Sequence, residues 1–366
     1  MRKLASIQTI TDIHPIEGKD RIVLATVEGW HVIVTKDFNV GDNVVYVEID
    51  SLMPEKPEFE FLRPKKFKIK TMKMGNAVSQ GICFPLSILP PRDQPYEVGE
   101  DVTEILGVKH IEETVDDPVT TNPAQQTKRS PLVRFLLRFA VFRRLLLPKK
   151  ETGAFPSEYI SKTDETRAQN LPWLFGSDEA KNTRWVATEK IDGTSGTWLL
   201  VQRHKAFGRR AYDYYVCSRN KRLVTDDGSV YWQIEHKYQI RDKLMNLIGD
   251  QEFVAIQGEC IGPKIQGNKY KVTEPDMYVF NFITSANGRG SSVRARDMLG
   301  TRGFNFVPII DTNFILPDTV DKMVAAADGT SALNPKVLRE GLVVRSSDGK
   351  QSFKAVSNKF LLKWQE

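Results

Sequence analysis

The chain has 366 residues, of which 27% are charged and 40% hydrophobic, and its formal net charge is +6. This length predicts two domains, or one large domain with a linker, and the composition is typical of a soluble globular protein. The N-terminal residues lack the apolar core of a secretion signal, which excludes a signal peptide. The modest positive charge weakly favours a polyanionic partner, and it serves solubility equally well.

The first part of the sequence, residues 1–108, predicts an all-β domain. Turn signals separate short alternating runs, and such spacing is typical of a small barrel. An OB-type barrel fits the number of runs, and another small barrel fits nearly as well. The expected strands are Ala5–Ile10, Arg21–Val27, His31–Val34, Asn43–Ile49, Phe67–Met72 and Gly81–Phe84.

A row of lysines stands out in the fifth of these strands. Because strand side chains alternate, Lys66, Lys68 and Lys70 should share one face while Phe67 and Ile69 take the other. Such a face suits a nucleic-acid backbone. A solvated strand face, or a set of lysines that protects a sheet edge, explains the pattern equally well.

Residues 109–153 are expected to form a linker that contains one apolar helix. The segment 112–131 is polar and rich in proline. The segment 132–147 is very apolar but is shorter than a comfortable membrane span and carries four arginines. Because its polar face is narrow, we favour a helix that packs between domains over one that lies on a membrane or a partner.

The last part, residues 154–366, predicts an α+β domain made mostly of strands. Helices are expected at Val230–Ile248, Val293–Leu299 and Val320–Ala327. Strands are expected at Trp185–Ile191, Thr197–Val201, Tyr214–Ser218, Phe253–Gln257, Met277–Ile283, Gly341–Arg345 and Ser352–Val356.

The three cysteines of the chain, Cys83, Cys217 and Cys260, are far apart and form no CxxC pair. This usage argues against a zinc site and for a reducing compartment, so we expect a cytoplasmic or other intracellular location.

The most informative motif is Lys-x-Asp-Gly at the end of the strand that starts at Trp185. Lys190 and Asp192 fall on the same side of that strand before the turn at Gly193. A lysine in this setting can act as a covalent nucleophile if a metal ion offsets the neighbouring carboxylates. By composition alone the pattern occurs by chance in roughly one chain in ten of this length, so it needs partners.

Further clusters supply those partners in a regular order along the chain. Attack on a phosphoanhydride requires carboxylates for a divalent metal and cations for the phosphates. Asp192, Glu259 and Glu340 are candidate metal ligands, and magnesium need not touch all three. Each residue alone has an ordinary structural explanation. The expected phosphate cations are Lys354 and Arg219, and Phe280 or Phe282 would stack on the base while at least one of the two packs in the core.

The residues and the order of these clusters resemble the motifs of the ATP-dependent RNA ligases of the covalent nucleotidyltransferase superfamily. Lys190–Gly193 is similar to motif I, Ser218–Asn220 to motif Ia, Gly258–Glu259 to motif III, Tyr278–Phe282 to motif IIIa, Glu340–Gly341 to motif IV and Lys354 to motif V. Four further stretches resemble this family, and two of them resemble the OB module of a branch in which that module comes first. These stretches are Lys162–Pro172, Ile265–Tyr270, Ile16–Ile22 and Val40–Pro54.

The resemblance implies an N-terminal OB domain followed by a nucleotidyltransferase domain of antiparallel sheets with flanking helices. It implies ATP, Mg²⁺ or Mn²⁺, and an AMP bound covalently to Lys190, with Glu259, Glu340 and Lys354 in the catalytic set. The expected partner is RNA, as a nicked duplex with RNA at the 3′-hydroxyl side, and a monomer is expected. Nucleotide-binding residues on this reading include Glu189, Arg167, Arg219, Phe280, Phe282, Lys354 and Lys363.

Two departures from the family pattern affect these expectations. The second motif V lysine is replaced by Val356, so Lys359 or Lys363 would have to compensate. The apolar segment 132–147 is not a feature of this branch.

The chain stops at Glu366, which on this sequence leaves no room for the C-terminal OB domain of DNA ligases and capping enzymes. A DNA or mixed polynucleotide ligase, and an inactive nucleic-acid-binding protein, remain the alternatives.

Overall fold

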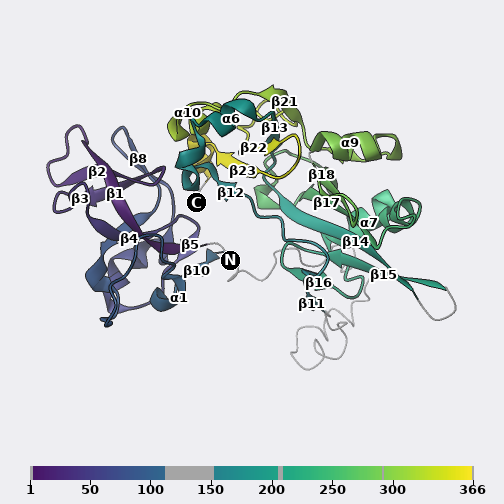
Figure 1. Ribbon diagram of the computed structural model, residues 1–366, viewed down its shortest axis with the longest axis horizontal. Helices are drawn as coiled ribbons and strands as arrows, with labels where there is room; N and C mark the ends of the chain where they lie inside the picture. The colour runs from purple at the N-terminus through teal and green to yellow at the C-terminus, as the bar shows by residue number, and fades with distance from the viewer. Residues whose placement is uncertain (1–2, 112–151, 205–208, 291, 365–366) are drawn as a thin grey trace, which may run out of the picture.

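The structure, a computed structural model, describes residues 3–111, 152–204, 209–290 and 292–364. A small N-terminal barrel lies beside a larger body built of two sheets (Figure 1). This arrangement confirms the expected OB-type barrel followed by an α+β domain. The predicted apolar helix at 132–147 falls outside the described residues. None of the helices in the described part of the chain is long and apolar enough to span a bilayer.

The barrel is built on a five-stranded antiparallel sheet in the order β3-β2-β1-β4-β9. Alternation buries one side of each strand, as in β3 where Trp30, Val32 and Val34 are buried. The strands of this sheet are β1 (Ala5–Pro15), β2 (Ile22–Val27), β3 (Trp30–Thr35), β4 (Asn43–Val47) and β9 (Ile82–Pro85). Shorter pieces complete the barrel: β5 (Ser51–Leu52), the 3-10 helix η1 (Pro57–Lys65), β6 (Lys68–Ile69), β7 (Met72–Met74), β8 (Ala77–Ser79), α1 (Thr103–Leu106) and β10 (Lys109–His110).

The lysine-bearing strand expected at Phe67–Met72 is wrong in its extent. Lys66 and Phe67 adopt left-handed backbone conformations, with φ of 53° and 57°, so regular strand pairing starts only at β6. The alternation itself survives, because Phe67 and Ile69 are buried. Lys66 is exposed, and Lys68 and Lys70 are partly exposed.

The larger body consists of an eight-stranded sheet and a five-stranded sheet, and most of their strand pairs are antiparallel. The eight-stranded sheet contains β11 (Thr152–Ala154), β14 (Thr194–His204), β15 (Arg210–Cys217), β16 (Lys221–Leu223), β17 (Phe253–Ile261), β18 (Asp276–Thr284), β19 (Gly288–Arg289) and β20 (Asn305–Phe306). The five-stranded sheet contains β12 (Thr166–Arg167), β13 (Trp185–Lys190), β21 (Ile309–Phe314), β22 (Gly341–Ser346) and β23 (Ser352–Val356).

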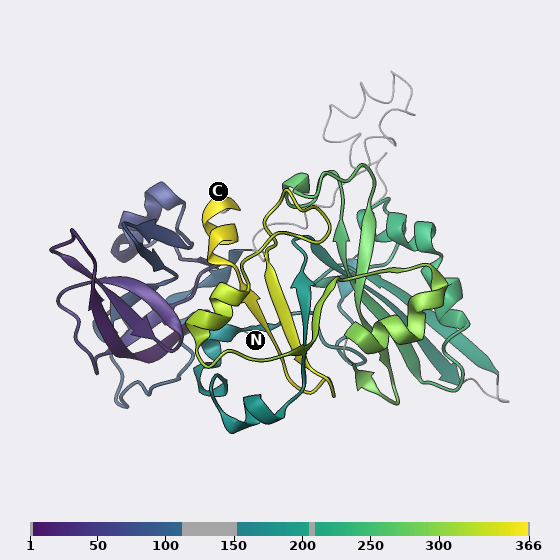
Figure 2. The same ribbon diagram turned by 90° about the horizontal axis from the view of Figure 1, so that it is seen from above.

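Helices cover both sheets. Apolar side chains of α7 (Val230–Tyr238), α8 (Ile240–Met245) and α9 (Ser292–Leu299) share one buried cluster with the eight-stranded sheet. Side chains of α6 (Asp178–Asn182) and α10 (Val320–Ala326) pack with the five-stranded sheet. The C-terminal helix α11 (Asn358–Trp364) lies beside the barrel (Figure 2).

The single helix predicted at Val230–Ile248 is two helices, which corrects the expectation. Gln239 has a left-handed φ of 50° and separates α7 from α8. The carboxylate of Glu235 accepts a hydrogen bond from the Arg241 N–H at 3.2 Å. This side chain therefore satisfies a backbone donor at the start of α8, where a continuous helix would have used a carbonyl.

The barrel is bonded to the larger body through the segment that follows β12. Trp30 Nε1 donates to Asn170 Oδ1 at 2.5 Å, and the Gly29 N–H donates to the Gln169 carbonyl at 2.9 Å. Val356 and Leu361, from the end of β23 and from α11, belong to the buried core of the barrel. The two bodies therefore share packing as well as polar contacts.

Candidate active site

A cavity of about 810 Å³ opens between the two sheets of the larger body. Strand ends from both sheets line it, together with the loop that follows β17 and the segment 163–165. It is large enough for a nucleotide, since small-molecule sites commonly measure roughly 300–1,000 Å³. Its lining includes five residues that the sequence singled out as catalytic: Lys190, Asp192, Glu259, Glu340 and Lys354.

Lys190 occupies the last position of β13 and is paired with Gly341 of β22. This register brings Glu340, which precedes Gly341, next to the lysine. Lys190 Nζ donates to Glu340 Oε2 at 2.6 Å, and the two side chains are 24% and 15% exposed. Two residues 150 positions apart in the chain thus form the central ion pair of the cavity.

Two glycines allow the strands to approach this closely. A Cβ on Gly341 would collide with the carbonyl of Ala355, and one on Gly193 would collide with the carbonyl of Cys260. Each glycine lets one backbone pass another without a side chain between them. The glycines of the Lys-x-Asp-Gly and Glu-Gly pairs therefore have a structural reason in this fold.

Carboxylates dominate the electrostatics around Lys190. Burial by itself would lower the pKa of Lys190, but Glu340, Glu259 and Asp192 outweigh it and raise that pKa. Burial, together with Glu340, raises the pKa of Asp192 to about 6. Burial also raises the pKa of Glu259 to about 8, against the opposing effect of Lys190. The positive charge near these carboxylates is thus too small to keep their pKa values low, and Lys190 stays protonated.

The donor set fits a divalent cation that arrives with other ligands. In the described ranges, no group of three or more His, Cys, Asp and Glu side chains is placed to hold a metal ion. Magnesium, however, takes one or two carboxylates and completes its shell with waters and substrate phosphates. The shortage of positive charge fits that mode of binding, and the available carboxylates are Asp192, Glu259 and Glu340.

The cations expected to contact phosphates lie on one side of the cavity. Lys354 Nζ donates to Asp164 Oδ1 at 2.8 Å, and an Arg219 guanidinium nitrogen lies 3.4 Å from the same oxygen. Asp164 thus lies between the two cations that the sequence assigned to phosphates. Only 8% of Lys354 is exposed, so its ammonium is held close to the cavity wall.

The two candidate aromatic residues separate in the structure. Phe280 lines the cavity, as does Val343 of β22. Phe282 is 6% exposed and belongs to the core beneath α7 and α9. Of the two expected stacking residues, Phe280 is thus the one at the cavity, and Phe282 is the core residue of the pair.

Of three other residues expected to contact the nucleotide, one lines the cavity and two lie outside its lining. Glu189 borders the cavity, but its carboxylate is buried and accepts a hydrogen bond from the Ala332 N–H at 2.8 Å. Arg167 lies outside the cavity lining, at the barrel junction, where its guanidinium donates to Asp50 Oδ2 at 2.6 Å. Lys363 is exposed on α11, with its ammonium 5.1 Å from the centre of the Trp364 ring, and it is also outside the lining.

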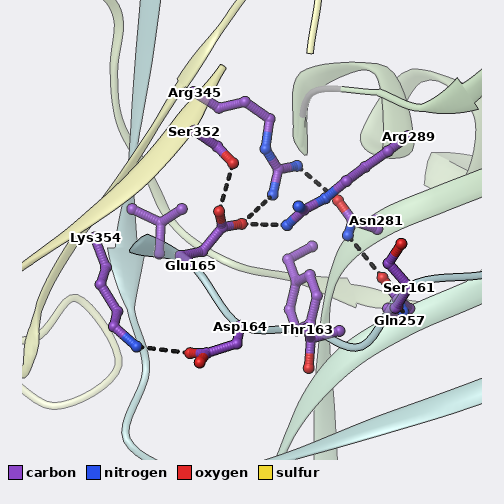
Figure 3. A network of polar contacts seen from close by, with 12 residues as sticks. Ser161, Thr163, Asp164, Glu165, Gln257, Asn281, Arg289, Arg345, Ser352 and Lys354 are labelled. Carbon is purple, nitrogen blue, oxygen red and sulfur yellow. Dashed lines mark hydrogen bonds and ion pairs between the residues drawn. The ribbon is translucent and has the colours of Figure 1, made fainter. Parts of the chain in front are cut away.

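Sequence reasoning missed a buried network around Glu165, next to the Asp164–Lys354 ion pair (Figure 3). The Glu165 carboxylate contacts Arg289 and the Ser352 hydroxyl, and it accepts a hydrogen bond from Arg345 at 3.1 Å. Arg345 also donates to Asn281 Oδ1 at 2.6 Å. The network joins the two sheets. Its members Glu165, Arg345 and Ser352 lie in stretches that the sequence singled out for other reasons, but no local pattern links them.

Comparisons with known proteins agree with this geometry. An RNA ligase family model matches residues 183–364, and an OB-fold domain model matches residues 4–86. The solved structure of Naegleria gruberi RNA ligase with PPi is 31% identical, with 100% of this chain and 99% of that chain covered and a TM-score of 0.78.

Variants of the same Naegleria enzyme match equally well. One solved with ATP and Mn is 32% identical, with 100% and 99% covered and a TM-score of 0.79. An apo variant is 31% identical, with 100% and 98% covered and a TM-score of 0.78. No curated protein sequence matches the chain.

Proposed function

The chain belongs to the RNA ligase family, and from this premise we propose that it joins 3′-hydroxyl and 5′-phosphate ends of RNA through an AMP carried on Lys190. ATP would be the nucleotide. The observation that carries the proposal is the Lys190–Glu340 ion pair, which lies in a nucleotide-sized cavity together with the Phe280 ring and the Lys354 and Arg219 cations.

In the first step, Lys190 Nζ attacks the α-phosphorus of ATP. A nitrogen–phosphorus bond forms and the bond to the β-phosphate oxygen breaks, so pyrophosphate leaves with the electron pair. Lys190 must lose a proton before it attacks, and its neighbours hold that proton on the amine. Glu340 Oε2, 2.6 Å from Nζ, is placed to take it.

The remaining residues position and neutralise the nucleotide. Mg²⁺ or Mn²⁺ held by one or two of Asp192, Glu259 and Glu340 would supply the positive charge that lowers the proton affinity of Lys190. Lys354 and Arg219 would exchange their contact with Asp164 for the phosphates. Phe280 would stack on the base.

Two transfers complete the reaction. A 5′-phosphate oxygen of RNA attacks the phosphorus of the lysyl-AMP, and the amine of Lys190 leaves. The 3′-hydroxyl of the other RNA end then attacks the activated 5′-phosphate and releases AMP. Lys66, Lys68 and Lys70 of the barrel would hold the duplex that presents these ends.

Incubation with α-labelled ATP and a divalent metal, followed by mapping of the modified residue, tests the first step. We expect one label on Lys190 and none in Lys190→Ala. Lys181→Ala changes an exposed lysine of α6, and this matched control should label normally. A label that persists in Lys190→Ala would refute the assignment. Nicked duplexes with RNA or DNA at the 3′-hydroxyl side then separate RNA sealing from DNA sealing.

A further inference from the structure

A second lysine reaches the catalytic carboxylates from the loop between β17 and β18. Lys269 Nζ contacts Asp192 Oδ2 and donates to the Gln266 carbonyl at 3.1 Å. The two charged side chains are only 12% and 14% exposed. A pair so well shielded from water interacts more strongly than a surface pair.

Aromatic rings of the C-terminal helix hold the same ammonium from another side. Lys269 Nζ lies 5.3 Å from the centre of the Phe360 ring and 5.6 Å from that of Trp364. Both distances fall within the range of cation–π attraction. Lys269 therefore links the Lys-x-Asp-Gly turn to α11.

The backbone of the loop is built to keep Lys269 in this place. Gln266 and Asn268 have left-handed φ values of 46° and 48°, which non-glycine residues adopt at a cost. The Asn268 side chain closes the loop through two hydrogen bonds with Val272, at 2.9 and 3.0 Å. The Tyr270 hydroxyl accepts a hydrogen bond from the Asp192 N–H at 2.8 Å, so the loop grips the turn at two points.

The other lysines that could replace the missing motif V cation are engaged elsewhere. Val356, which takes the position of that cation, is 2% exposed and packs in the barrel core. Lys359 Nζ lies 3.0 Å from Asp328 Oδ2, and Lys363 is exposed on α11. Of Lys269, Lys359 and Lys363, Lys269 is the one that contacts an active-site carboxylate.

We propose that Lys269 is a positioning residue that acts as the internal counter-ion of Asp192. It competes with the divalent cation for that carboxylate, and this inference rests on the proposed function. When Lys269 is paired with Asp192, the oxygen available to an incoming cation is already neutralised. A bound cation must therefore displace the ammonium or share the carboxylate with it. Lys269 and the metal are then coupled negatively.

The test measures metal binding to the full chain without nucleotide. The unfolding temperature is followed while Mn²⁺ is added, and the half-saturating Mn²⁺ concentration is read from the shift. In Lys269→Met this concentration should fall at least about fivefold, the low end for coupling between two bound groups. Lys269→Arg keeps the charge and should stay within about twofold of the wild type. Lys271→Met changes an exposed lysine of the same loop, and this control should not change it.

A half-saturating concentration that is unchanged or higher in Lys269→Met would overturn the proposal. If that variant does not fold, Lys269→Gln, which removes the charge but keeps a polar side chain, must show the same fall. In an Asp192→Asn background the Lys269 substitution should have no effect, and a persisting effect would also refute the proposal. The Mn²⁺ titration contains no ATP and therefore tests this inference separately from the proposed function. If the Mn²⁺ midpoint falls in Lys269→Met while the wild type forms no lysyl-AMP in the separate incubation with α-labelled ATP, the proposed function is refuted and this inference stands.

Discussion

Replacing Glu165 by glutamine should destabilise the larger body strongly, although the shape of the side chain hardly changes. Glu165 neutralises Arg345 and Arg289, whose side chains are 5% and 32% exposed. Burial already lowers the pKa of Arg345 to about 10, so this guanidinium is poorly solvated even with its partner. The substitution leaves two guanidinium groups facing each other without a counter-ion.

The expected cost is about 3 kcal/mol, at the low end of the range for breaking a buried ion pair. The low end applies because Arg345 keeps its hydrogen bonds to Asn281 Oδ1 and to the Gly290 carbonyl, at 2.6 and 2.9 Å. Arg289 adds little, since water reaches it.

Urea unfolding followed by tryptophan fluorescence measures this cost, with Glu158→Gln as an exposed control that should change stability by less than about 0.5 kcal/mol. The double variant Glu165→Gln/Arg345→Met removes the stranded charge and should recover at least half of the loss. A loss below about 1 kcal/mol in the single variant, or no recovery in the double variant, would refute the electrostatic reasoning.

Three further predictions concern the active site, the barrel junction and the barrel surface. Burial raises the pKa of Glu259 from its ordinary 4.5 to about 8. Between these two values the native state keeps a proton that the unfolded chain releases, so the free energy of unfolding of the metal-free protein should fall from pH 5 to 8. Glu259→Gln should flatten that fall in thermal unfolding, and an unchanged slope would argue against the shift. In Gly29→Ala the new Cβ would lie 2.7 Å from the Gln169 carbonyl oxygen, so limited proteolysis should show a loosened barrel. Gly300→Ala, at a glycine with open space around it and no left-handed φ, should not. Charge reversal of Lys66, Lys68 and Lys70 should weaken RNA binding and flatten its salt dependence in filter-binding titrations while lysyl-AMP formation is kept, and equal loss of both would indicate misfolding.

Local patterns predicted the parts of the site that depend on a single strand. The alternation of β13 and the turn after it place Lys190 and Asp192 at the cavity, and β23 has the predicted bounds. Residues with ordinary local roles, such as Glu340 and Lys354, could be assigned through the order of motifs. These assignments needed no knowledge of distant contacts.

Features that depend on distant contacts could not be predicted in this way. Phe280 and Phe282 should share one face of a regular strand, but the register of β17 with β18 shifts between Gln257 and Gly258. An extra residue in β18 at this bulge turns Phe280 toward the cavity and Phe282 toward the core. Arg167 similarly meets Asp50, 117 residues away, through tertiary packing that no local pattern specifies.

The packing of Val356 and Leu361 inside the barrel has a consequence for the modularity of the molecule. Both residues follow closely on Lys354, so the end of the strand that carries this cavity-lining lysine is anchored in the barrel. A polypeptide trimmed to the ligase half would expose these two apolar side chains to water and loosen the end of β23. The larger body thus depends on contacts with the barrel for part of its rigidity. We expect the two parts to unfold together, although they are separate in the sequence.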